Sequence, residues 1–164
     1  MGYDIYIGNT TMEEVEQEDD EMITTPYFRC IKGNTIYYRP VVRELSVADA
    51  PSFVGDEYTG KGNSRRPGYS SWHNFCEATG LLDLFFHKKT GLMREHPGHA
   101  SLSSEHLQQI QQAHDAFVRK YPHAHPSYRE DDPVENYHLI RLLWLEWWIR
   151  YAIEQCEHAA IYNF

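Results

Sequence analysis

Residues 139–156, LIRLLWLEWWIRYAIEQC, decide the fold, because they are apolar on nearly every face of a helix. A surface helix keeps a broad polar face, whereas a helix that is apolar all round belongs in the middle of a core. Pro133 lies just upstream, and proline suits the first turn of a helix, where its missing N–H is not needed. We therefore predict a central core helix over residues 134–159.

One narrow stripe of this helix is polar. Glu146, Arg150 and Glu154 follow one another at spacings of four, so they share a face and can form ion pairs in water. Arg141 lies about 180° from that stripe, among apolar positions. Burying an arginine without an anion, a carboxylate or a route to water is costly. Arg141 is therefore either a structural residue or a ligand-binding one, and both interpretations stay open.

Three further helices are expected before the core helix, over residues 70–79, 81–89 and 103–121. Ser70 or Ser71 can cap the first, since a side-chain oxygen there accepts from the free backbone N–H groups. In the third, apolar side chains recur at spacings of three and four, the period of one helical face. Between the second and third, the segment HPGH predicts a turn.

The first half of the chain predicts β-structure. Residues 27–32 (YFRCIK) and 35–42 (TIYYRPVV) flank Gly33-Asn34, and a two-residue Gly-Asn connection between strand-prone runs is a strong hairpin signal. Residues 3–7 (YDIYI) predict a short strand, and Gly8-Asn9 is expected to end it.

Size and pattern together predict one α+β domain over residues 1–164. A small antiparallel sheet, made of the N-terminal strand and the hairpin over residues 27–42, is expected to be packed by three to four C-terminal helices. No run reaches the roughly 18 apolar residues of a membrane helix, and no secretion signal precedes the first strand. The three cysteines are scattered, as in a reducing cytoplasm. We expect a cytoplasmic protein that does not enter a membrane.

The net charge of −9 is unevenly distributed. Residues 1–22 carry eight acidic side chains and no basic one. Residues 11–22 are expected to form an exposed loop or short helix that folding does not require, because so many carboxylates cannot be buried unpaired. This segment is a candidate docking site for a basic protein partner, whereas the acidic average argues against binding to duplex nucleic acid.

The densest positive charge lies in a glycine-rich segment, GKGNSRRPGYSSW, at residues 60–72. Glycines let backbone N–H groups converge on an anion, and a helix N-terminus adds more of them. Arginine binds phosphate oxygens in pairs, and aromatic faces let a ring stack. We predict an anion site with Arg65 and Arg66 at the surface; the alternative is a solvated loop that offsets the acidic N-terminus. The expected ligand-binding residues are Gly60, Lys61, Gly62, Ser64, Arg65, Arg66, Tyr69, Ser70, Ser71, Trp72 and Arg141.

Metal binding and thiol chemistry have weaker support. The pairs His96/His99 and His123/His125 flank opposite ends of a helix about 27 Å long, so one metal site is not expected to use both. His73 and Cys76 are spaced to neighbour each other on a helix, but no third residue is evident to orient the histidine. We expect no cofactor, no metal and no catalytic residue.

Three functions stay open. The first, which the basic loop favours, is non-catalytic binding of a small anionic ligand that bears phosphate or resembles a nucleotide. The second is an acidic protein-interaction or inhibitory module, such as a viral accessory protein. The third is a hydrolase or transferase in which the same basic loop works with a histidine as general acid or base. The sequence leaves the ligand, the source and the oligomeric state open.

Overall fold

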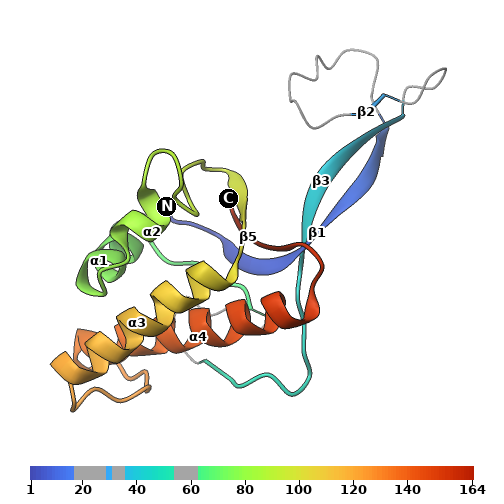
Figure 1. The fold of residues 1–164 in the computed structure, drawn as a ribbon. Coiled ribbons are helices and arrows are strands. Elements are labelled where there is room, and N and C mark those ends of the chain that lie inside the picture. The colour runs from blue at the N-terminus through green and yellow to red at the C-terminus, as the bar shows by residue number, and fades with distance from the viewer. Residues whose placement is uncertain (17–28, 31–35, 54–62) are drawn as a thin grey trace.

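The computed structural model describes residues 1–16, 29–30, 36–53 and 63–164. They form an α+β fold, which confirms the predicted class (Figure 1). The described strands are β1 (Ile5–Glu16), β2 (Arg29–Cys30), β3 (Ile36–Glu44), β4 (Gly98–Ser101) and β5 (Ala159–Asn163). The described helices are α1 (Tyr69–Ala78), α2 (Leu82–Phe86), α3 (Ser104–Lys120) and α4 (Val134–Gln155).

The strands form one antiparallel sheet in the order β2-β3-β1-β5-β4. Beyond the residues that pair with β5, strands β1 and β3 continue as an arm, residues 10–16 and 36–42, which rises away from the helices and in which β2 also pairs with β3 (Figure 1). In the β2–β3 pair, Cys30 lies opposite Tyr37. That register is the one a two-residue connection at positions 33 and 34 requires, although these two positions lie outside the described residues.

Strand β1 runs well past Gly8 and Asn9, so the expectation that they end it is wrong. A Cβ on Gly8 would lie 1.9 Å from the backbone oxygen of Arg43 in β3, so only glycine allows the two strands to come this close. The Asn9 side chain accepts a hydrogen bond from the backbone N–H of His158, at 3.0 Å. Both residues serve strand packing here, although their types are those of a turn.

The acidic segment is strand in its described part. Residues 11–16 continue β1 and pair with β3, so the expected loop or short helix is wrong there. Glu13 forms an ion pair with Arg43 across the arm, and Glu14 is exposed. Carboxylates on a strand face can stay in water or meet a cation while the backbone is paired. Residues 17–22 lie outside the described residues, and the dispensability of this segment for folding stays a prediction.

Strands β4 and β5 did not stand out in the sequence. Helix α4 ends at Gln155 rather than near residue 159, and the chain then returns as β5 between β1 and β4. The expected turn at residues 96–99 becomes β4 from Gly98 onward. Both segments are short, and their pairing with distant strands decides their conformation more than local propensity does.

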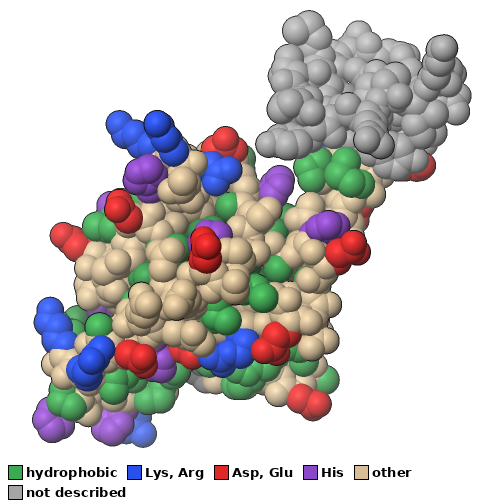
Figure 2. All heavy atoms as spheres, in the orientation of Figure 1, with side chains coloured by type: hydrophobic (Ala, Val, Ile, Leu, Met, Phe, Trp, Pro, Cys, Tyr) green, Lys and Arg blue, Asp and Glu red, His purple; other side chains and the backbone are tan. Residues whose placement is uncertain are grey.

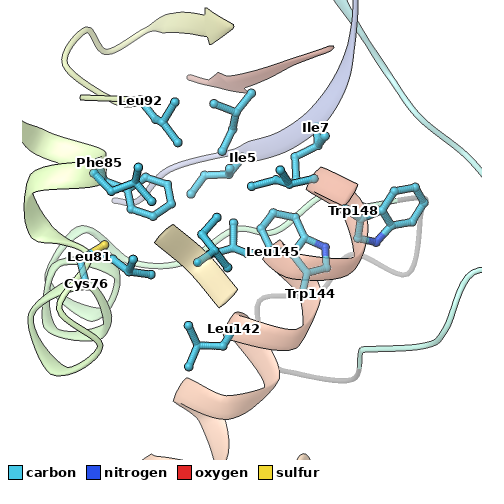
Figure 3. Packing of buried hydrophobic residues seen from close by; sticks show 14 of the residues in the cluster. Ile5, Ile7, Cys76, Leu81, Phe85, Leu92, Leu142, Trp144, Leu145 and Trp148 are labelled. Carbon is cyan, nitrogen blue, oxygen red and sulfur yellow. The ribbon is translucent and has the colours of Figure 1, made fainter. Parts of the chain in front are cut away.

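The core forms where α4 packs against the sheet and the other helices. Figure 3 shows Ile5 and Ile7 of β1 above Trp144 and Leu145 of α4, and all four side chains are fully buried. The predicted central core helix is thus confirmed. Helices α1 and α2 close one side of this core with further buried apolar residues, which are Trp72, Phe75, Cys76, Leu84 and Phe85.

Candidate functional site

The glycine-rich loop is tied to β1 in its described part. The backbone of Arg65 exchanges two hydrogen bonds with Ile5, both at 2.8 Å, and the Tyr3 N–H donates to the Pro67 oxygen at 2.9 Å. These bonds place the loop along the start of β1, on the edge opposite β5 and ahead of the residues that pair with β3. Residues 63–68 are therefore part of the framework of the sheet.

Asn63 fixes the entry to this loop from a fully buried position. Its Oδ1 accepts from the Ile7 N–H at 2.6 Å, and its Nδ2 donates to the Ile7 oxygen at 2.8 Å. A third bond joins Nδ2 to the Leu45 oxygen at 3.0 Å. The side chain thus pairs the backbone of β1 as a neighbouring strand would, at the point where β3 ends.

The two arginines of the loop have different environments. Arg65 is fully buried, so its expected surface position is wrong. Its Nη2 donates to the Phe53 oxygen at 2.8 Å, and its guanidinium lies 5.3 Å from the centre of the Trp144 ring. Arginine tolerates this position because its planar head stacks on aromatic rings while its N–H groups donate. Arg66 is exposed, as expected, and its Nε donates to Asp4 at 2.5 Å.

The other predicted ligand-binding residues do not converge on one point. Trp72 is fully buried, with its ring 4.8 Å from that of Phe75, so it has no face open to a ligand. Helix α1 begins at Tyr69 with Gly68 as its N-cap, which corrects the expected serine caps. Ser64 donates to Glu44 at 2.6 Å, and Ser70 is exposed. Outside the described residues lie Gly60, Lys61 and Gly62.

Two predicted residues, Ser71 and Arg141, meet at a cavity of about 390 Å³ between the first turns of α1 and α4. We call it the α1–α4 cavity. Its described lining residues are Ser71, Asn74, Val134, Tyr137, His138 and Arg141. No acidic side chain is among them, so Arg141 gives this wall of the cavity its charge.

Arg141 is held by α1 and packs on the core. The residue is only 4% exposed. Nη2 donates to the Ser71 hydroxyl at 2.8 Å and Nη1 donates to the Ser71 backbone oxygen at 3.1 Å. The guanidinium also lies 5.9 Å from the centre of the Trp72 ring and 5.6 Å from that of Phe75. These two bonds fix the orientation of the guanidinium.

His138 lies beside Arg141 and is 7% exposed. Burial, and then the nearby charge of Arg141, lower the pKa of His138 to about 4, while Glu135 acts in the opposite direction. The ring is therefore neutral near pH 7. Within the described part of the chain, its Nδ1 is buried and makes no hydrogen bond. The imidazole therefore adds no positive charge beside the Arg141 guanidinium near pH 7.

Thiol and metal chemistry find no support among the described residues. Cys76 is fully buried, and burial raises the pKa of its thiol, so the thiolate is disfavoured. His73 stacks on Phe86 at a ring distance of 4.6 Å. No group of three His, Cys, Asp or Glu side chains in the described ranges is placed to hold a metal ion.

The sequence contained a signal for the missed cavity residues. Positions 134, 137 and 138 precede Arg141 by seven, four and three residues, so all four share one face of α4. Asn74 follows Ser71 by three residues in α1 and shares its face in the same way. Helical spacing around Arg141 indicates these neighbours, whereas charge density along the sequence indicates the loop.

Comparisons with known proteins give no relative: no protein-family model, curated protein or solved structure matches this chain. In the residues that the structure describes, no helix has the length and apolar character needed to cross a membrane.

Proposed function

We propose that this protein binds a small anionic ligand in the α1–α4 cavity, and that Arg141 recognises the negative charge. One observation carries the proposal: Arg141, a residue only 4% exposed, lines a cavity whose described lining has no acidic residue. Arginine stays protonated when buried, so it keeps its attraction for an anion. Planar N–H groups match the oxygens of phosphate or carboxylate.

The cavity has the size and lining of a small-molecule site. Such sites usually measure about 300–1,000 Å³ and combine apolar walls with a few polar groups. Tyr137 supplies an aromatic wall, and Ser71 and Asn74 supply polar atoms beside the guanidinium. A ligand that joins a ring to a phosphate would use both kinds of surface. Each charge-assisted contact with Arg141 contributes about 1.5–3 kcal/mol, which is roughly ten- to a hundredfold in affinity.

The position of the site differs from the one that the sequence predicted. The basic loop was expected to hold the ligand, with Arg141 beneath it. Arg141 and Ser71 are central in the proposed site. Arg65 instead donates to the Phe53 oxygen, and Arg66 forms an ion pair with Asp4. Binding by the residues of the loop itself is a separate prediction, and the variants below distinguish the two.

The experiment is a thermal-shift screen followed by calorimetric titration. The probes are inorganic phosphate, glucose 6-phosphate and AMP. A ligand at about a hundred times its Kd should stabilise the fold by about 2.7 kcal/mol, a shift of several degrees in Tm. Arg141→Lys keeps the charge but loses the planar head, and it should weaken binding of any hit at least roughly tenfold.

Arg150→Lys is the matched control. It changes an arginine of the same helix that pairs with Glu146 at 2.8 Å and does not line the cavity. This variant should bind as the wild type does. If no probe stabilises the wild type, or if Arg141→Lys binds as tightly as Arg150→Lys, the proposed function is wrong. If Arg66→Ala weakens binding instead, the ligand lies at the loop.

A further inference from the structure

Tyr69, His96 and Asn163 form a chain of hydrogen bonds near the start of α1. Tyr69 and Ser71 are two residues apart, so their side chains leave α1 in directions about 200° apart. This second group is therefore separate from the α1–α4 cavity. The inference below does not depend on the function proposed for that cavity.

Asn163 fixes the chain of hydrogen bonds from within the protein. It is fully buried, and its Nδ2 donates to the backbone oxygens of Glu95 at 3.0 Å and Gly98 at 3.2 Å. Two carbonyl acceptors take both amide hydrogens, so Oδ1 must point the other way and can only accept. His96 Nδ1 lies 2.7 Å from that Oδ1. The imidazole therefore carries its hydrogen on Nδ1.

This tautomer leaves a lone pair on His96 Nε2, and Tyr69 uses it. The Tyr69 hydroxyl lies 3.2 Å from Nε2, so the phenol donates to the imidazole. The ring of Tyr3 packs edge-on against both partners, with centroid distances of 4.6 Å to Tyr69 and 4.9 Å to His96. His96 is exposed and Tyr69 is half-buried, so a molecule in solution can reach the pair.

We propose that Tyr69 is a nucleophile for phosphoryl transfer from phosphate esters, with His96 as its general base and Asn163 as the positioning residue. A nucleophile and a base within hydrogen-bond reach, with the base oriented by a third group, make up the recurring arrangement of covalent catalysis. No local pattern indicates this group, because its three members lie on α1, in the turn before β4, and on β5.

The reaction proceeds in two balanced steps. In the first, Tyr69 Oη attacks phosphorus while its proton moves to His96 Nε2, and the ester P–O bond breaks as the leaving alcohol takes that proton. In the second, water attacks the phosphotyrosine, His96 accepts the proton of the water, and the P–O bond to Tyr69 breaks. The proton then returns to Tyr69, and inorganic phosphate leaves. The net reaction is hydrolysis of the ester.

Nearby positive charge favours an anionic ester over a neutral one. The connection between α2 and β4, which leads into His96, carries the exposed side chains of Lys88, Lys89 and Arg94. Figure 2 shows basic side chains gathered over this connection. Clustered cations raise the local concentration of an anionic substrate.

The test uses the full chain and 4-nitrophenyl phosphate, whose cleavage releases coloured nitrophenol. Wild-type protein should release it above the buffer blank. Tyr69→Phe should lower the rate at least roughly a hundredfold, because the nucleophile and its activated proton are gone. Tyr162→Phe is the matched control. Tyr162 is half-buried and lies one position before Asn163 on β5, so its side chain points to the opposite face of the sheet. This variant should keep full activity.

Two further readouts separate catalysis from a structural role. After an acid quench, mass spectrometry should find one phosphoryl group on Tyr69 in the wild type, since phosphotyrosine survives acid and phosphohistidine does not. His96→Gln should lose most of the activity, because the glutamine side chain cannot accept the phenol proton as the imidazole does. Asn163→Ala should lower kcat with KM unchanged; if it does not fold, the exposed His96→Gln still tests the base.

Absence of nitrophenol release from the wild type would overturn the proposal. Equal activity of Tyr69→Phe and Tyr162→Phe, or a label on another residue, would overturn it as well.

Discussion

Replacing Asn63 with alanine tests whether the described part of the glycine-rich loop is structural. Asn63 is fully buried and makes three hydrogen bonds to the backbone of Ile7 and Leu45, at 2.6, 2.8 and 3.0 Å. Asn63→Ala removes the side-chain partners of one buried N–H and two carbonyl oxygens. The Ile7 carbonyl keeps its bond from the Leu45 N–H at 3.1 Å, whereas the buried Ile7 N–H is left without its Asn63 partner.

The expected cost follows from the burial of each group. An unsatisfied buried donor or acceptor costs about 1–3 kcal/mol. The Ile7 groups are buried, whereas the bond to Leu45 is only partly buried, so water can replace that partner. The main cost is the unpaired Ile7 N–H, and the lost bonds to the two carbonyls add to it, so we expect Asn63→Ala to lower the free energy of unfolding by about 2–4 kcal/mol. In a domain of this size that corresponds to a drop in Tm of roughly 5–10 °C.

Urea unfolding followed by circular dichroism measures this cost. Asn74→Ala is the control, because Asn74 is exposed on α1, and its change should fall within about 0.5 kcal/mol. Asn63→Asp keeps an acceptor for the Ile7 N–H but loses both donors, so it should also be strongly destabilised. A cost below about 1 kcal/mol for Asn63→Ala would refute the structural role of the loop.

Three further predictions concern stability and reactivity. The pKa of His138 is about 4 in the fold and 6.5 in the unfolded chain, so the unfolded state binds more protons between these pH values. The free energy of unfolding should therefore fall by up to about 3 kcal/mol as the pH drops from 6.5 to 4, and it should fall less in His138→Phe. In a Cys30→Ser/Cys156→Ser background, Cys76 should react with a thiol reagent only on unfolding, because it is fully buried and its thiol pKa is raised; fast labelling of native protein would contradict this. Ser103→Ala should lower the free energy of unfolding by about 1 kcal/mol in a urea titration, because the Ser103 hydroxyl lies 3.1 Å from His106 Nδ1 in the cap of α3. An unchanged urea midpoint would rule out this cap.

Local sequence patterns predicted the elements whose conformation depends on their own residues. Helix α3 starts and ends where its cap and its apolar spacing indicated, and α4 is the core helix that its apolar faces predicted. The β2–β3 pair has the register expected of the hairpin. In each case the deciding interactions join residues close in sequence, so the sequence displays them directly.

Elements that depend on distant partners were missed or misplaced. Gly8 has the residue type of a turn, but close approach of Arg43 in β3 explains it. Residues 159–163 become a strand because β1 and β4 lie on either side of them. The charge pattern indicated a surface cation at Arg65, whereas its guanidinium lies over the Trp144 ring and donates to the Phe53 oxygen. Charge density alone does not show whether an arginine serves a ligand or the core.

The most direct test of the central claim is an NMR titration of the labelled protein with inorganic phosphate, following the Arg141 side-chain N–H and His138 ring signals. We predict that both signals shift with a single saturating curve, together with the backbone amides of Ser71 and Asn74, because these residues line the α1–α4 cavity. Signals of Arg150 should stay in place. Shifts confined to residues outside the cavity, or no saturable shift of Arg141, would contradict anion binding at this site.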